Sequence, residues 1–234
     1  MGKWYGRLAI NFDYWNKHIA IDNVHALEKL GAGHDGIVYA YDDLALKIFK
    51  SEKILAYKSA LAFSDLTLKK VVGPCGIIFD DNGAYCGYIM KKINKVSDDV
   101  SLDAFKPEQM VHSIVDLKSD FMGLSSKGIV AEDINNGSFL IDEDSFLHLC
   151  DVDKYVFSNS SVSARNKQRL HYAISRFMVS HMPSLSDSQK ATYVRKSTTD
   201  PEYLRSLEMI LDGSNNYGSV GEFVKDVEET VKKR

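Results

Sequence analysis

Cysteine is scarce in this sequence, and its few copies do not form the pattern of a zinc site or a disulfide framework. The three cysteines among the 234 residues stand at positions 75, 86 and 150, far apart and without C-x-x-C spacing. An odd number of scattered cysteines is typical of reduced thiols in the core of a cytosolic protein. We therefore expect a cytoplasmic location and a fold that depends on its apolar core.

Long apolar segments and an excess of charge of one sign are also missing. No apolar run is long enough to cross a bilayer, and none near the start reads as a signal peptide. The 29 Lys and Arg residues nearly balance the 32 Asp and Glu residues, which leaves a formal net charge of -3. Proteins that bind nucleic acid or acidic lipid usually carry a basic surface. We expect neither nucleic acid nor a membrane among the partners.

Three glycines at G-x-G-x-x-G spacing are the most informative feature that is present. In a dinucleotide-binding fold such glycines open a helix, whereas here the β-branched and aromatic run 37–41 follows them and favours a strand. The turn Asp42-Asp43 and the apolar run 44–49 predict a returning strand, with Lys47 set among apolar residues. Glycines let backbone amides approach phosphate oxygens, and a lysine in such a strand needs an anion.

These residues resemble the motifs of the protein-kinase-like superfamily. The pattern G-x-G-x-x-G-x-V is matched from Gly31 to Val38, and the V-A-I-K strand is matched from Leu44 to Lys47. The resemblance implies that ATP lies under the glycine-rich hairpin and that Lys47 neutralises its phosphates. The nucleotide-binding residues that it implies in this part of the chain are Gly31, Gly33, Gly36, Val38 and Lys47.

The rest of the first third continues this pattern. The apolar runs 76–79 and 85–90 predict two more strands, and the resemblance implies that Met90 is the gatekeeper and that Lys91 to Ile93 form the hinge that binds adenine. Residues 51 to about 63 have helical composition at the place of the kinase regulatory helix. That helix should carry a glutamate paired with Lys47, and Glu52 is the only glutamate in it.

The remainder of the chain reads as helical. Met110 and the apolar residues after it, at spacings of three and four, predict a helix from Pro107 to a stop at Gly128. Further helices are expected at about 164–182, 186–197, 201–211 and 219–233. We therefore expect an α+β protein of the two-lobe kinase-like fold, a single domain over 1–234. It would comprise an outer extension (1–24), a strand-rich lobe (25–93) and a helical lobe (94–234).

Two aspartates flank a pair of short apolar runs in the middle of the chain. The runs 139–141 and 146–150 predict a hairpin around the acidic turn 142–144, with Asp133 before it and Asp151 after it. The kinase pattern H-R-D-L-x-x-x-N, followed by a hairpin and D-F-G, implies that Asp133 is the catalytic aspartate and Asp151 a magnesium ligand. A carboxylate at Asp133 could orient an acceptor hydroxyl, and one at Asp151 could hold Mg²⁺.

The sequence departs from this pattern at several positions. Ala131 and Glu132 replace the histidine and the arginine, Ser138 stands at the metal-binding asparagine, and Val152-Asp153 replaces F-G. No A-P-E triplet occurs, and the next helix follows closely, so we expect no activation loop and no switching by its phosphorylation. In these respects the chain resembles the reduced bacterial serine/threonine kinases, some of which are injected effectors.

The resemblance implies a metal site made of Asp151, Ser138 and Asp153. A serine hydroxyl is a weaker ligand than an asparagine carbonyl, so we expect low turnover with a high requirement for Mg²⁺ or a preference for Mn²⁺. Asp153 could supply the missing oxygen, or it could simply pair with Lys154 at the surface.

Three functions are compatible with these patterns. The first is an ATP-dependent phosphotransferase that acts on serine or threonine of an unidentified protein, with Asp133 and Lys47 as the central residues. The second is a pseudokinase, a nucleotide-binding module that docks a partner. The third is a small-molecule kinase, because the shortened acceptor region leaves no visible platform for a peptide.

Overall fold

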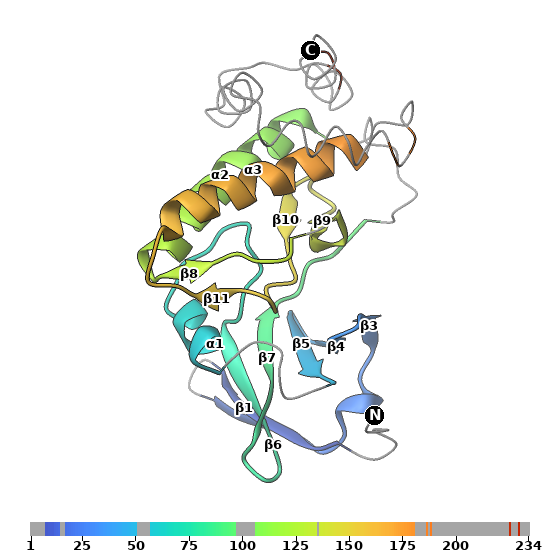
Figure 1. Cartoon of the computed structure of the whole chain (residues 1–234). Helices are drawn as coiled ribbons and strands as arrows, with labels where there is room; N and C mark the ends of the chain where they lie inside the picture. Colours follow the sequence, from blue (N-terminus) through green and yellow to red (C-terminus); the bar gives the residue numbers. More distant parts are fainter. Residues whose placement is uncertain are drawn as a thin grey trace.

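The chain has an α+β fold built on a seven-stranded antiparallel sheet of strand order β2-β1-β6-β7-β5-β4-β3. The computed structural model describes residues 8–14, 17–50, 57–96, 106–134 and 136–180, together with positions 186, 188, 225 and 229. Figure 1 shows the sheet, with the short helix α1 beside it, in the lower half of the molecule. These elements are β1 (Ile10–Tyr14), β2 (Lys17–Ile21), β3 (Lys29–Ala32), β4 (Gly36–Tyr41), β5 (Leu44–Phe49), α1 (Tyr57–Ser64), β6 (Gly76–Asp80) and β7 (Tyr85–Lys91).

The glycine-rich hairpin predicted from the sequence is confirmed as β3–β4, and its returning strand as β5. Asp42 takes a φ of 51° in the turn between β4 and β5, a left-handed conformation that aspartate tolerates better than most residues. Residues 10–14 and 17–21 belong to the expected outer extension, but they form two strands of the sheet itself. Ile10 and Phe12 are buried in its core, so this segment completes the sheet instead of covering it.

Strand β5, which lies between β7 and β4, is buried on both faces. Because side chains alternate along a strand, Leu44, Leu46 and Ile48 enter one core together with residues of β1, β6 and β7. Ala45 and Phe49 enter the larger core on the opposite face. Lys47 lies between them in sequence, so it points to this second face, toward the helical half of the molecule.

The helical half contains two long helices that pack side by side above four short strands (Figure 1). The first helix begins with proline at its first turn, as predicted, and is followed by Gly128 at a φ of 73°. The elements are α2 (Pro107–Ser126), β8 (Ile129–Val130), β9 (Phe139–Ile141), β10 (Leu147–Leu149), β11 (Val156–Phe157) and α3 (Val162–Ser180). The helices expected at 186–197, 201–211 and 219–233 lie outside the described residues, apart from single positions.

One carboxylate ties the sheet half to the helical half. Asp120 of α2 accepts hydrogen bonds from the backbone N–H groups of Lys69, Lys70 and Val71, at 2.7 to 3.1 Å. These residues follow α1, and Val71 pairs with Leu149 of β10. The larger apolar core runs without a break from the sheet face through α1 to α2 and α3, so the two halves are held at a set distance.

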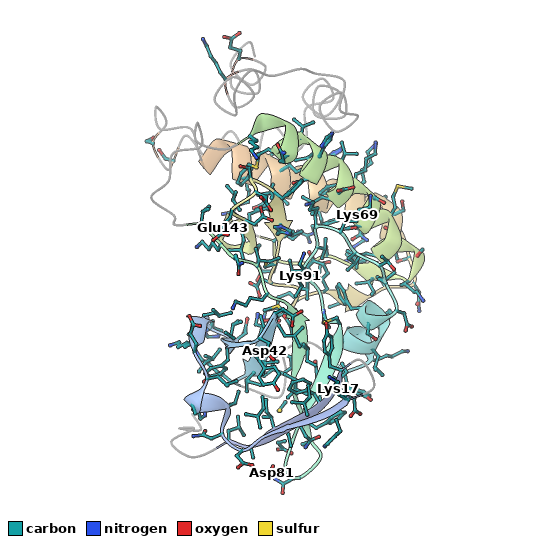
Figure 2. The ribbon with its side chains drawn as sticks, turned by 180° about the vertical axis from the view of Figure 1, so that it is seen from behind. Lys17, Asp42, Lys69, Asp81, Lys91 and Glu143 are labelled. Atoms are coloured by element: carbon teal, nitrogen blue, oxygen red, sulfur yellow. The ribbon has the colours of Figure 1, made fainter. Side chains whose placement is uncertain are left out.

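The chain crosses between the halves a second time after β7. Figure 2 shows Lys91 at this junction, close to the Asp42 turn of the sheet. The N–H of Lys92 donates to the carbonyl of Asp43 at 3.1 Å, and Lys95 then pairs with Asp142 beside β9. Within the residues that the structure describes, no helix is long and apolar enough to span a membrane.

Candidate functional site

A row of side chains crosses four strands on the sheet face that looks toward the helical half. The register places Gly31 opposite Val38, Val38 opposite Lys47, and Lys47 opposite Tyr88. Directly opposite residues of antiparallel strands share a face, so the predicted glycine, valine and lysine lie in one line. The neighbouring row pairs Ala45 with Met90, both of which are buried.

Lys47 contacts two carboxylates that come from the turn after β10. Its Nζ lies 3.0 Å from Oδ1 of Asp151 and 2.5 Å from Oδ2 of Asp153. The second contact is an ion pair whose atoms are not aligned as a hydrogen bond. The other oxygen of Asp153 accepts a hydrogen bond of 2.9 Å from the hydroxyl of Tyr88. Residues 104 positions apart thus meet at one charged centre.

The two carboxylates differ in their exposure to solvent. The side chain of Asp151 is 45% exposed, whereas that of Asp153 is 1% exposed and that of Lys47 is 11% exposed. Burial lowers the pKa of Lys47, but Asp153 and Asp151 together reverse this effect and hold it above its ordinary value. Burial raises the pKa of Asp153, and the Lys47 ammonium opposes that rise. The short contact supports a charged lysine paired with a charged Asp153.

The tip of the glycine-rich hairpin, residues 33–35, is fixed to the same region. The N–H of Gly33 donates to the carbonyl of Gly36, and Lys50 donates to the carbonyl of Gly33. Asp35 forms an ion pair of 3.3 Å with Lys154, the residue that follows Asp153. The hairpin tip and the turn with the two carboxylates therefore lie on the same side of the sheet. Of the two alternatives for Asp153, the pairing with Lys154 at the surface is wrong, because Asp153 is buried and Lys154 binds Asp35.

No model of a protein family matches the chain, and no curated protein matches it. The functional argument therefore rests on the geometry of this site.

The three glycines of the hairpin differ in whether the packing of the fold leaves room for a side chain. A Cβ on Gly36 would lie 2.8 Å from the carbonyl oxygen of Ile48, so packing demands glycine there. A Cβ on Gly31 or Gly33 would meet nothing within 4 Å, and neither has a left-handed backbone. Since the fold does not need glycine at 31 or 33, close approach of a ligand is a physical reason for it.

Alanine substitutions separate these two roles. Gly36→Ala should lower the free energy of unfolding by about 1–3 kcal/mol, as crowding in a packed region does. Gly31→Ala and Gly33→Ala should leave it within about 0.5 kcal/mol of the wild type but weaken ATP binding. Urea denaturation measures the first effect, and the melting temperature with and without ATP measures the second. Wild-type ATP affinity in Gly33→Ala would show that the hairpin does not approach the phosphates.

Asp133 lies on a short exposed loop that is held from both sides. Ala131 is buried and its N–H donates to the side chain of Asn166 at 2.9 Å, while Ile134 is buried in the core. Asp133 itself is exposed and has a φ of 52°, a left-handed conformation that is uncommon for residues other than glycine. The anchored neighbours thus direct its carboxylate outward.

Glu132, the residue at the arginine position of the kinase pattern, has a defined role in the fold. Its two carboxylate oxygens contact the guanidinium groups of Arg165 and Arg169, both from α3. Arg165 also donates to the hydroxyl of Ser158 at 3.1 Å. Helix α3 therefore binds the carboxylate of Glu132 directly. The sequence offered a weak signal for this, since two arginines four residues apart share one helix face.

The predicted metal ligands do not share one environment. Asp151 is half exposed and has a φ of 64°, whereas Ser138 is fully buried and its carbonyl accepts the N–H of Cys150 at 2.6 Å. Among the described residues, no three His, Cys, Asp or Glu side chains gather closely enough to hold a metal alone. Mg²⁺ commonly takes one or two carboxylates and completes its shell with phosphate and water. Asp151 fits that requirement, while Ser138 and Asp153 stay predictions as ligands.

The predicted adenine-binding residues lie where the chain leaves the sheet. Met90 and Lys91 end β7 and pair with Ala45 and Leu44, and Ile93 packs at the margin of the larger core. The expected glutamate partner, Glu52, lies outside the described residues. The sequence patterns named Asp153 as a candidate metal ligand but did not predict its contact with Lys47, and they missed Tyr88 altogether, because Tyr88 stands in no motif.

Proposed function

We propose that this protein is an ATP-dependent phosphotransferase that acts on serine or threonine side chains of a protein. The observation that carries the proposal is the contact of 3.0 Å between Lys47 and Asp151. Each residue was singled out by a separate kinase-like motif, and the motifs lie more than one hundred positions apart. A lysine and an exposed carboxylate beside a glycine-rich hairpin are the groups that phosphoryl transfer requires.

The chemistry assigns one task to each group. Lys47 would neutralise the phosphates of ATP, and Asp151 would hold the Mg²⁺ that screens their charge. Asp133 would accept a hydrogen bond from the acceptor hydroxyl and take up its proton as the oxygen bonds to the γ-phosphorus and ADP leaves. Asp133 suits this role because it is exposed on an anchored loop. The glycine-rich hairpin would cover the phosphates.

We extend the proposal to the architecture. The seven-stranded sheet with α1 would be the nucleotide-covering lobe, and α2, α3 and β8–β11 would be the second lobe of a kinase-like fold. The crossing at Lys91–Lys95 supports this division, because the glycine hairpin and Lys47 precede it and both aspartates follow it. The adenine would then lie against Ala45 and Met90, the buried row beside Lys47.

The first experiment tests nucleotide binding and transfer in the wild type. Saturating ATP with Mg²⁺ should raise the melting temperature, since a ligand present at 100 times its Kd stabilises the folded state by about 2.7 kcal/mol. Labelled γ-phosphate should then appear on the protein or on a generic protein acceptor. Binding without any transfer favours the pseudokinase, and transfer only to metabolites favours the small-molecule kinase. No shift with ATP, ADP or GTP would refute the proposal.

A further inference from the structure

Lys47 has a carboxylate partner that does not come from the regulatory helix. In the kinase-like pattern this lysine pairs with a glutamate of the helix after its strand. The described part of that helix, α1 (Tyr57–Ser64), contains no acidic residue. The structure instead brings Asp153 to 2.5 Å from the Lys47 ammonium. The partner thus comes from the far side of the site, two residues after Asp151.

Asp153 is held more firmly than an ordinary surface carboxylate. Its neighbours Val152 and Tyr155 are buried, and the N–H of Tyr155 donates to the carbonyl of Val152 in a tight turn. Oδ1 of Asp153 accepts the hydroxyl of Tyr88, which is fully buried. A buried carboxylate with a lysine on one oxygen and a tyrosine on the other has little freedom to turn.

Tyr88 connects the carboxylate to the strand that flanks the lysine. Tyr88 lies directly opposite Lys47 in the β5–β7 register, and its ring packs edge-on to Phe49 at 5.8 Å between centroids. Lys47, Asp153 and Tyr88 therefore form a closed unit, here called the lysine triad. Any shift of Lys47 along the sheet face would break contacts in the triad.

We propose that Asp153 is the positioning residue for Lys47, and that it does the work that the helix glutamate does in the kinase-like pattern. The two carboxylates at Lys47 would then divide their tasks by exposure. Asp151, half exposed, faces the metal and the phosphates, whereas Asp153, buried, holds the lysine from behind. This inference rests on the proposed nucleotide site.

The same geometry speaks against Asp153 as a metal ligand. Both of its carboxylate oxygens are engaged, one by an ammonium and one by a hydroxyl donor. A divalent cation 2.0–2.1 Å from either oxygen, as Mg²⁺ requires, would have to displace one of these groups. If Asp153 were a metal ligand instead, its substitution would change the concentration of metal that activity requires.

Asp153→Asn and Asp151→Asn form the matched pair that tests the proposal. Asp153→Asn should raise the KM for ATP at saturating Mg²⁺ by at least about tenfold, as loss of one partner of a buried charge pair does. It should leave the Mg²⁺ concentration for half-maximal activity unchanged. Asp151→Asn should do the reverse and raise the metal requirement strongly. A higher metal requirement in Asp153→Asn, with its KM for ATP unchanged, would overturn the proposal.

Two further variants keep the test decisive if Asp153→Asn folds poorly. Tyr88→Phe removes one hydrogen bond without removing bulk, and it should raise the KM for ATP in the same direction by a smaller factor. A double-mutant cycle of Lys47→Met and Asp153→Asn, followed by urea denaturation, reads the coupling without any nucleotide. Additive losses would overturn the triad. Coupling in a wild type that binds no ATP would keep the ion pair but overturn both its role toward nucleotide and the proposed function.

Discussion

Lys47→Met is expected to abolish the rise in melting temperature that we predict for the wild type with ATP and Mg²⁺. Lys47 is the cation that the structure places beside Asp151 under the glycine-rich hairpin. Methionine keeps the length of the side chain but offers nothing to a phosphate. Because charge-assisted contacts to phosphate are among the strongest in proteins, saturating ATP should no longer stabilise the variant.

The structure adds a second effect to this substitution. Methionine would leave the buried Asp153 without its cation, and breaking a buried ion pair by removing one partner costs about 3–5 kcal/mol. Lys47→Met should therefore be less stable even without ATP. The double variant Lys47→Met/Asp153→Asn should recover part of this loss, because the buried charge is gone. The double variant therefore separates the loss of ATP binding from the loss of folding stability.

The pH dependence of the single variant identifies the unpaired carboxylate. Burial raises the pKa of Asp153 above the ordinary value of 3.8, and Lys47→Met removes the cation that opposes this rise. The folded variant then binds a proton at higher pH than the unfolded chain does, so its stability falls as pH rises through the folded pKa. The difference in free energy of unfolding between the variant and the wild type should shrink as the pH is lowered from 7 toward the pKa of an ordinary carboxyl group. A deficit independent of pH would contradict this account.

Lys17→Met is the matched control for these measurements. Lys17 is exposed on β2, at the opposite edge of the sheet from the glycine-rich hairpin. This variant makes the same chemical change away from the site. It should keep both the stability and the ATP response of the wild type. An equal loss of ATP response in both variants would show that the effect of Lys47→Met is not local.

Asp133→Asn is expected to remove phosphoryl transfer while ATP binding persists. The carboxylate is exposed on the anchored loop 131–134, and it makes no contact with Lys47. Asparagine has nearly the same shape and tolerates a left-handed φ, so the backbone at 52° should be retained. It cannot take up the proton of the acceptor, and loss of such a group lowers kcat by about 10²–10⁴. Label transfer measures this, alongside the melting temperature with ATP.

Asp144→Asn provides the comparison for this second prediction. Asp144 is an exposed aspartate in the turn of the β9–β10 hairpin, away from the lysine triad. Its substitution should change neither transfer nor binding. Unchanged transfer in Asp133→Asn would mean that this residue serves only the loop. A loss of ATP binding in the same variant would mean that Asp133 faces the nucleotide instead of the acceptor.

Much of the secondary structure follows from short-range patterns. The expected strand 44–49 is β5, and the expected strand 139–141 is β9, because short apolar runs and the turn residues beside them act within a few positions. The helix that starts at Pro107 obeys the same local rules. The strands of residues 10–21 were harder to place, because their pairing with β6 joins segments about seventy positions apart.

In the candidate site, too, local sequence patterns predict some features, whereas contacts between distant residues decide others. The resemblance to kinase motifs predicted Lys47, Asp133 and Asp151 as site residues, because each stands at the distance from a turn or strand that those motifs have. The metal assignment of Asp153 followed from its place after Asp151, yet burial and the Tyr88 hydroxyl decide its surroundings. Likewise, the sequence shows at Glu132 only that the arginine of the kinase pattern is missing. The structure shows that Arg165 and Arg169 of α3 bind its carboxylate.

The sequence by itself predicted the glycine-rich hairpin with its returning strand, the strands β6, β7, β9 and β10, and the helix that begins at Pro107. Those features depend on periodicity and turn chemistry, which act over a few residues. Only the tertiary structure decided which carboxylate holds Lys47, since that depends on which side chains meet across the sheet face and which are removed from water. The contacts of Tyr88 with Asp153 and of Lys47 with Asp151 join residues 65 and 104 positions apart. Contacts over such distances leave no periodic trace in the sequence, so the contacts of Asp153 with Lys47 and Tyr88 emerge only when the chain is folded.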